Sequence, residues 1–345
     1  MIFSKKILAW YNENKRELPW RSTKDPYKIW LSEIMLQQTR VAQGLPYYKK
    51  FVTEFPSVYD LAEAREEKVL KLWQGLGYYS RARNMHTTAK TIVEEFNGKF
   101  PASYKELIKL KGVGDYTASA IASISFNEPE PVVDGNVYRV LARYFGIDLP
   151  INSSEGIKHF KSLAREVMNI ENIRDYNQGI MEFGAIQCAP KKPYCLHCPI
   201  NDSCVALKEN RVNELPVKLK KTKVKKRYFN YLIVLDRNNH TLLEQRQGKG
   251  IWQNLYQFPL LETDKVMELE SLEGKVRSIL KPNSISDILL YNDKPIVHKL
   301  SHQHLHTKFW IVQIANELKG GLPWEEVSNF PVPVLIADII KTYKI

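Results

Sequence analysis

The chain has 345 residues, and 44% of them are hydrophobic. A chain of this length is longer than one hydrophobic core usually serves, so we expect two or three packed domains. Its longest apolar stretch near the start is four residues and no later run approaches membrane-spanning length, which predicts a soluble cytosolic protein. The formal net charge of +12 favours polyanionic partners. Solvated surface lysines would give the same excess, so charge alone names no partner.

Helical periodicity dominates the first 212 residues. Apolar residues recur at three- and four-residue intervals, as at Ile29, Trp30, Ile34 and Met35, which is the spacing of one helix face. Proline and glycine residues interrupt the pattern at intervals. The region is therefore predicted to be all-α.

Glu33 lies in one of these predicted helices, beside Ile29 and Trp30. Such neighbours would exclude water from the carboxyl group and raise its pKa toward that of a useful acid. Glu33, Gln37 and Arg40 also stand at i, i+4 and i+7, which fits a solvated polar face. From the pattern alone the solvated face is the simpler interpretation.

A glycine-rich turn separates two predicted helical segments near residues 104–125. Gly112 and Gly114 stand one residue apart, between an apolar segment and a helix of small residues. Glycines permit a tight turn, and free amides at the following helix N-terminus can hold a phosphate without reading sequence. The pattern predicts a helix-hairpin-helix, with a plain interhelical turn as the alternative.

Asp134 follows Val132 and Val133 and precedes a helical segment that begins near Asn136. The position predicts a helix N-cap. A helix N-terminus also favours an ionised carboxylate, so we expect Asp134 to stay negative while Glu33 holds a proton.

All four cysteines lie within 17 residues, in the spacing Cys-x6-Cys-x2-Cys-x5-Cys. Four thiolates in one loop suit a [4Fe-4S] cluster. Structural zinc is the alternative, but only one pair forms a short Cys-x-x-Cys knuckle, and nothing indicates the oxidising compartment that disulfides need. The predicted cluster ligands are Cys188, Cys195, Cys198 and Cys204.

The composition changes after residue 212. Between residues 218 and 227 seven of ten residues are basic, so we expect an exposed basic linker over 213–228. Segments 229–235, 241–246 and 308–315 are rich in strand formers, and 333–343 has a helical pattern. Residues 229–345 are predicted to form a small α/β domain.

Several motifs together resemble one enzyme family. Besides the hairpin and the cysteine spacing, the motifs are LPWR (18–21), WLSEIMLQQT (30–39) and VDGNV (133–137). Over residues 1–212 the chain resembles the endonuclease III superfamily of base-excision glycosylases, and in particular its adenine-specific branch. The resemblance implies removal of adenine mispaired with 8-oxoguanine or guanine in double-stranded DNA.

The resemblance also implies roles for four side chains. Adenine leaves poorly until its imidazole ring is protonated, and its departure leaves an oxocarbenium-like sugar that needs an anion. By resemblance Glu33 protonates the base, Asp134 stabilises or traps the sugar cation, and Tyr116 and Asn136 position these groups. Bifunctional relatives place a lysine at position 116 to form a Schiff base, so Tyr116 implies a monofunctional enzyme.

Flipping a base from the duplex calls for side chains that fill the gap and grip the base. The family pattern implies that Gln38 enters the vacated stack and that Tyr78 wedges beside the lesion, although core packing would also explain aromatic residues. The candidate substrate and DNA contacts are Arg16, Trp20, Arg21, Gln38, Tyr78, Gly112, Gly114, Glu182, Lys191, Lys192, Ser301 and His302.

Residues 229–345 resemble the Nudix-like lesion reader of the same family, including the segment GIWQNLYQFP (250–259). No Arg-Glu-x-x-Glu-Glu arrangement is present to hold Mg²⁺, so pyrophosphate hydrolysis is not expected. Leu300 stands where the family has an aromatic wedge, whereas Ser301 and His302 match. Residues 298–306 hold four histidines, for which a metal site is an alternative to solvated imidazoles on a hairpin.

The predicted protein is thus multidomain: an all-α helix-hairpin-helix glycosylase domain with an iron-sulfur module (188–204), then a Nudix-like domain. One alternative is an endonuclease III-like glycosylase/lyase, which Tyr116 and the second domain disfavour. Another is a non-catalytic iron-sulfur DNA-binding protein, which the presence of both Glu33 and Asp134 disfavours. We expect a monomer associated with cytoplasmic nucleoid DNA and no membrane partner.

Overall fold

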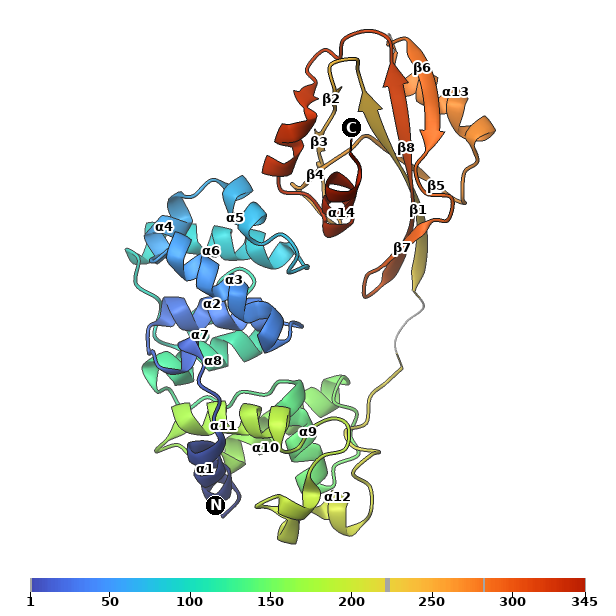
Figure 1. The fold of residues 1–345 in the computed structure, drawn as a ribbon. Helices are drawn as coiled ribbons and strands as arrows, with labels where there is room; N and C mark the ends of the chain where they lie inside the picture. Colours follow the sequence, from blue (N-terminus) through green and yellow to red (C-terminus); the bar gives the residue numbers. More distant parts are fainter. Residues whose placement is uncertain (1, 221–223, 282, 345) are drawn as a thin grey trace. The chain divides into compact units, whose positions relative to one another are not determined.

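The computed structural model describes residues 2–220, 224–281 and 283–344 (Figure 1). The chain forms two compact units, one of Met1–Glu63 with Asn84–Lys220 and one of Ala64–Arg83 with Lys221–Ile345. Residues 221–223 of the expected linker lie outside the described residues. Among the helices that are described, none has the length and apolar character needed to span a bilayer.

The first unit is helical throughout its described residues, as predicted. Helix α6 runs through the boundary at residue 84. The elements are α1 (Ile2–Asn14), η1 (Pro19–Arg21), α2 (Pro26–Leu36), α3 (Val41–Glu54), α4 (Val58–Glu63), α6 (Ser80–Phe96), α7 (Tyr104–Leu107), α8 (Asp115–Phe126), α9 (Gly135–Phe145), α10 (Ser154–Val167), α11 (Ile173–Ile186), η2 (Cys195–His197), η3 (Asn201–Ser203) and α12 (Val205–Lys208).

Small residues let the central helices approach closely. Helix α8 buries Ala118, Ala120 and Ala122 and packs against both α2 and α11. Where α11 meets α9, a Cβ added at Gly184 would lie 2.7 Å from the carbonyl oxygen of Asn136. Any larger residue at position 184 would therefore push apart two helices that carry predicted site residues.

The second unit is built on a mixed sheet. Its strands run in the order β6-β8-β1-β2-β9, with β5 paired to β1 and β7 to β8, and β3 and β4 form a separate pair. The elements are α5 (Glu66–Leu72), β1 (Lys225–Leu235), β2 (His240–Thr241), β3 (Glu244–Gln245), β4 (Tyr256–Gln257), β5 (Leu260–Thr263), α13 (Leu269–Ile279), β6 (Ile285–Leu290), β7 (Ile296–Lys299), β8 (Gln303–Ile314), β9 (Leu322–Pro323), η4 (Trp324–Asn329) and α14 (Val334–Thr342).

For residues 229–345, the structure confirms the two central strands predicted from the sequence. The strands predicted at 229–235 and 308–315 are the parallel pair β1 and β8, in register Tyr231 to Phe309. Helix α14 matches the helix predicted at 333–343. The segment 241–246, predicted to be rich in strand formers, contributes to two short strands, β2 and β3, which belong to different sheets.

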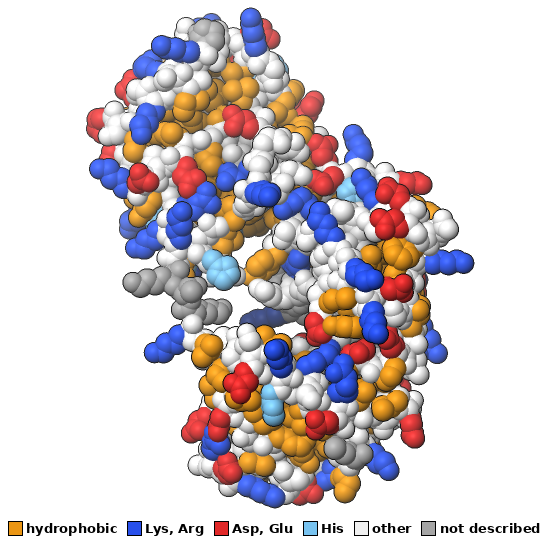
Figure 2. Space-filling view, turned by 180° about the vertical axis from the view of Figure 1, so that it is seen from behind, with side chains coloured by type: hydrophobic (Ala, Val, Ile, Leu, Met, Phe, Trp, Pro, Cys, Tyr) orange, Lys and Arg blue, Asp and Glu red, His pale blue; other side chains and the backbone are white. Residues whose placement is uncertain are grey.

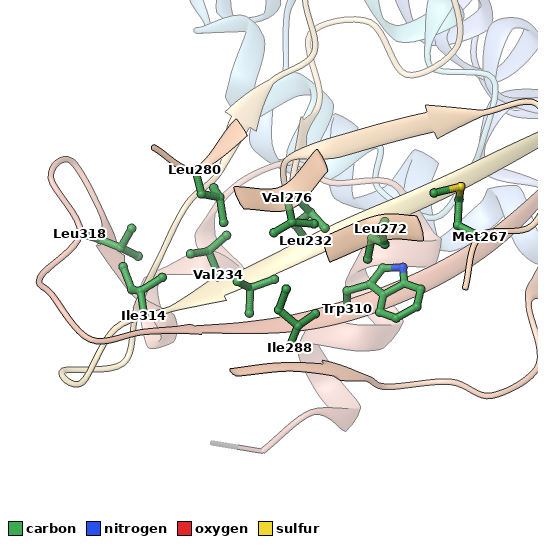
Figure 3. Close-up of a cluster of buried hydrophobic side chains, with 11 residues drawn as sticks. Leu232, Val234, Met267, Leu272, Val276, Leu280, Ile288, Trp310, Ile314 and Leu318 are labelled. Carbon is green, nitrogen blue, oxygen red and sulfur yellow. The ribbon is translucent and has the colours of Figure 1, made fainter. Parts of the chain in front are cut away.

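Alternation along β1 and β8 gives the sheet two apolar faces. One face packs against α13 through a buried cluster shown in Figure 3, which includes Leu232, Val234, Leu272, Val276, Trp310 and Ile314. The opposite alternation buries Phe229, Tyr231 and Phe309. Helices α13 and α14 flank the strands in Figure 1. Burial on both faces explains why these strands read as nearly continuous apolar runs.

Segment Ala64–Arg83 belongs to the second unit although its sequence precedes the helical hairpin. Asn254 donates to Glu66 (2.6 Å) and the Tyr256 hydroxyl donates to Glu67 (2.5 Å). Lys71 donates to the carbonyl of Phe330 at 3.0 Å. Helix α5 is thus tied to the β-rich part of the chain by polar contacts.

Candidate active site

One cavity of about 580 Å³ in the first unit gathers most of the predicted catalytic and substrate-binding residues. Its lining comes from residues far apart in the chain, at the ends of α2, α8, α9 and α11. The predicted residues on its wall are Arg16, Trp20, Arg21, Glu33, Gln38, Gly114, Tyr116, Asp134, Asn136 and Glu182. Gly112, Lys191 and Lys192 do not line it.

Glu33 is buried, with 7% of its surface exposed, and the hydroxyl of Tyr116 donates to its Oε2 at 2.5 Å. Burial raises the pKa of Glu33 to about 7, although the bond from Tyr116 lowers it. The solvated-face alternative is wrong, because α2 ends at Leu36 and Gln37 already has non-helical backbone. Glu33 can therefore carry a proton at neutral pH.

Asp134 is the N-cap of α9, as predicted. Its Oδ1 accepts from the backbone amides of Asn136 and Val137, both at 2.8 Å, and its Oδ2 accepts from the Asn136 side chain at 2.7 Å. Burial nevertheless raises the pKa of Asp134, and the hydrogen bonds that lower it only partly offset that effect. Burial therefore acts on the pKa of Asp134 in the opposite direction to the N-terminus of α9.

Glu182 occupies the same cavity but has cationic partners. Arg16 donates to it through Nε (2.7 Å) and Nη2 (2.6 Å), and Arg21 through Nη1 (2.8 Å) and Nη2 (2.6 Å). Burial alone would raise the pKa of Glu182, but these bonds outweigh it and lower the pKa to about 2. The nearby Trp20 ring is buried edge-on against Tyr48. Glu182 is therefore ionised at neutral pH and paired with two guanidinium groups.

The hairpin between α7 and α8 has the geometry that its glycines predicted. Gly112 has φ +77°, and an added Cβ there would lie 2.7 Å from the Cβ of Asn84. Gly114 is the N-cap of α8, so the first amides of that helix have no helical acceptor. Tyr116 stands in this first turn, which places its hydroxyl on Glu33.

The four cysteines line a second, small cavity and none forms a disulfide. Burial raises the pKa of Cys198 to about 12, so its thiolate would need positive charge nearby. Within the described residues, no three His, Cys, Asp or Glu side chains could hold a single metal ion, the clustered histidines included. Four cysteine side chains around one cavity are the type and number of donors that a multi-iron cluster takes.

Two arginines that the sequence did not single out bind the cysteine loop, and one of them, Arg139, also reaches a residue of the cavity wall. Arg139 donates to the Cys188 carbonyl (2.7 Å) and to Asn136 Oδ1 (2.9 Å), and Arg143 donates to the Ala189 carbonyl (2.8 Å). Both are buried. Their four-residue spacing, which places both on one face of α9, was a signal that could have found them.

Three predicted DNA contacts have positive φ without being glycine: Gln38 (54°), Tyr78 (48°) and Lys192 (47°). Such backbone is strained, and it is found most often at functional sites. Lys191 and Lys192 are both exposed on the cysteine loop. The sequence could not predict this strain, because Gln, Tyr and Lys residues normally avoid positive φ.

The second unit brings together two predicted lesion contacts from distant parts of the chain. The Tyr78 hydroxyl lies 2.5 Å from Ser301 Oγ, and the Tyr78 side chain is exposed. The Arg81 guanidinium lies 5.5 Å from the centre of the Tyr78 ring and donates to the carbonyl of Gly77. His302 is exposed beside Ser301.

Comparison with known proteins identifies both halves of the chain. Residues 31–166 match the model of the HhH-GPD superfamily of base-excision DNA repair proteins, and residues 230–342 match the NUDIX domain. A solved thermostable thymine-DNA glycosylase superposes with a TM-score of 0.56 at 32% identity, covering 60% of this chain and 96% of that one.

Curated relatives extend over nearly the whole chain. The adenine DNA glycosylase of Arabidopsis thaliana is 33% identical over 91% of this chain and 57% of its own length. That of Buchnera aphidicola subsp. Schizaphis graminum is 37% identical over 99% of both chains. With this level of identity, and with a cavity that holds Glu33 and Asp134 together, the chain belongs to the adenine DNA glycosylase family of base-excision repair enzymes.

Proposed function

We propose that this glycosylase hydrolyses the N-glycosidic bond of adenine mispaired with 8-oxoguanine or guanine in duplex DNA, as a monomer and without cleaving the strand. The observation that carries the proposal is the buried Glu33, bonded to Tyr116 in the cavity that also holds Asp134. A cavity of about 580 Å³ has room for a flipped purine.

In the first step, Glu33 gives its proton to a ring nitrogen of adenine. The bond between the base nitrogen and C1′ then breaks, its electron pair leaves with the base, and the sugar becomes an oxocarbenium ion. The carboxylate of Asp134, oriented by three hydrogen bonds, stabilises that cation or bonds to it briefly. Water adds to C1′ and returns a proton to Glu33, which restores the enzyme.

Strand cleavage by a lyase requires an amine that condenses with the opened sugar. Position 116 carries a phenol, and no lysine is among the described residues that line the cavity. The bifunctional alternative therefore has no nucleophile where the sugar would lie.

The cysteine loop would hold a [4Fe-4S] cluster through Cys188, Cys195, Cys198 and Cys204, which share one cavity. When bound, the cluster would cross-link the loop that carries Lys191 and Lys192 and supply the positive charge that stabilises the thiolates. The two lysines and the hairpin amides then contact phosphates on duplex DNA.

Reading of the base opposite adenine is assigned to Tyr78, Ser301 and His302. Tyr78 and Ser301 are already in contact, so the reading group is assembled before DNA binds. Leu300 lacks the ring that the family pattern has at its position, and Tyr78 is the exposed aromatic side chain beside it that can stack on a base.

The test is single-turnover excision on duplexes with adenine opposite 8-oxoguanine, guanine or thymine, each assayed with and without alkali. The proposal predicts alkali-dependent cleavage confined to the first two duplexes. Cleavage without alkali would indicate the lyase, and lesion binding without any excision would indicate the non-catalytic alternative. A Glu33→Gln protein is the matched control, because it keeps the shape of the side chain and loses the proton.

A further inference from the structure

An acidic side chain stands at the hairpin where DNA phosphate is proposed to bind. Asp115 is the first residue of α8, and 51% of its side chain is exposed. It lies directly after Gly114, next to the amides that would receive the phosphate. A bare carboxylate at this place would repel DNA.

Lys161 of α10 approaches this carboxylate from inside the fold. Its side chain is only 17% exposed, and its ammonium group donates to Asp115 Oδ2 (3.2 Å), Ser119 Oγ (2.8 Å) and the Pro131 carbonyl (2.9 Å). Three donors and three acceptors leave the ammonium group saturated. The Tyr104 hydroxyl donates to the other oxygen of Asp115 at 2.7 Å, so both oxygens are held.

The charges around Lys161 balance. Glu130 lies 3.8 Å from the ammonium group, and Arg165 pairs with Glu130 at 2.9 Å. Two acids and two bases thus form a neutral group beside the hairpin. Loss of Lys161 alone would leave one uncompensated negative charge close to the proposed phosphate.

We infer that Lys161 is a positioning residue for DNA binding, which neutralises Asp115 and turns it away from the phosphate held by the hairpin. This inference rests on the proposed function. Lys161 touches neither substrate nor reacting atoms and acts through Asp115. Its bonds to Ser119 and Pro131 also brace the helix that carries Tyr116 and the segment that leads to Asp134.

The experiment measures binding of the full-length protein to a fully paired duplex over a series of salt concentrations. A paired duplex isolates the phosphate contribution, because it offers no mispair to excise. Lys161→Met should weaken binding about tenfold at low salt, with the difference shrinking as salt rises. Asp115→Asn should tighten it several-fold, and the double variant should return to within about twofold of the unmodified protein.

Two controls separate charge from structure. Lys158→Met removes one exposed lysine from the same helix and should change the affinity less than about twofold. Lys161→Arg keeps the charge and should retain most of the affinity. If the double variant binds as weakly as Lys161→Met, Lys161 is a purely structural brace and the inference is overturned. An unchanged affinity in Asp115→Asn would also overturn it, and this test does not depend on whether the Lys161→Met protein folds.

Excision of adenine opposite 8-oxoguanine is measured in parallel on the unmodified protein. If the unmodified protein does not excise adenine but the Lys161 and Asp115 variants change duplex affinity as expected, the proposed function is wrong and the role of Lys161 is supported. If excision is fully active but neither Lys161→Met nor Asp115→Asn changes duplex affinity, the proposed function is supported and the role of Lys161 is wrong.

Discussion

The candidate cavity is lined by two buried glutamates, and their surroundings shift the pKa values of the two carboxyl groups in opposite directions. Burial raises the pKa of Glu33 to about 7, and its closest partner is a neutral phenol. Glu182 is buried as well, yet two guanidinium groups hold its pKa at about 2. The same residue type can thus hold a proton at one position and stays an anion at the other, because the charge of its neighbours differs.

The largest expected effect comes from removing the transferable proton. Glu33→Gln should lower the single-turnover excision rate at least about a thousandfold, because general acid catalysis is lost, while binding to the mispaired duplex remains. Rapid-quench assays and equilibrium binding measure the two quantities separately. Full activity in this variant would contradict the role of Glu33.

Removing the fixed anion should cost less. Glu182→Gln leaves Arg16 and Arg21 with a neutral partner, so the cavity wall that these three residues form should loosen and excision should fall about a hundredfold. Because the pKa of Glu182 is about 2, the pH profile of excision should show no titration step at acidic pH that is lost in Glu182→Gln. A variant as inactive as Glu33→Gln would mean that the two glutamates share the proton-transfer step.

The pH dependence of excision sharpens the contrast. The rate requires protonated Glu33 and should fall about tenfold per pH unit above pH 7. Tyr116→Phe removes a hydrogen bond that lowers this pKa, so the same fall should begin at higher pH even as the maximal rate drops about tenfold. A fall that begins at lower pH in the variant would reverse the assigned effect of the phenol.

The smallest expected effect is on stability. The pKa of Glu33 is raised from 4.5 unfolded to about 7 folded, so its stabilising contribution is complete below pH 4.5 and is lost as pH rises through 7. Glu33→Gln should therefore be more stable than the unmodified protein at pH 9, by about 3 kcal/mol, and should differ from it by less than about 1 kcal/mol at pH 5. Thermal melts at both pH values measure this, and equal shifts at both would argue against a buried, titrating carboxyl.

Much of the fold could be predicted because its signals are local. The hairpin follows from glycine spacing, the N-cap from Asp134 before an apolar helix, and the central strands from runs of β-branched and aromatic residues. The division of residues 241–246 between two sheets could not be predicted, because it depends on partners distant in sequence. The association of Ala64–Arg83 with the second unit depends on long-range contacts in the same way.

The sequence could predict which residues form the candidate site, but not their burial or their backbone conformation. The motifs pointed to Glu33, Asp134 and Tyr116, whereas a local polar pattern around Glu33 suggested exposure. The burial of Glu33 and the end of α2 at Leu36 remove that interpretation. The strained backbone of Gln38 and the buried bridge of Arg139 come from packing between helices. Figure 2 shows basic side chains spread over the visible face among acidic ones, so the net charge by itself points to no one binding surface.

The central claim is that burial keeps a proton on Glu33 at neutral pH. Difference infrared spectra between the unmodified protein and Glu33→Gln, recorded from pH 5 to pH 9, detect the carbonyl stretch of one protonated carboxyl group. The account predicts a band that disappears with a midpoint near pH 7. A midpoint near the ordinary value of 4.5, or no such band at pH 5, would show an ionised Glu33 and contradict the account.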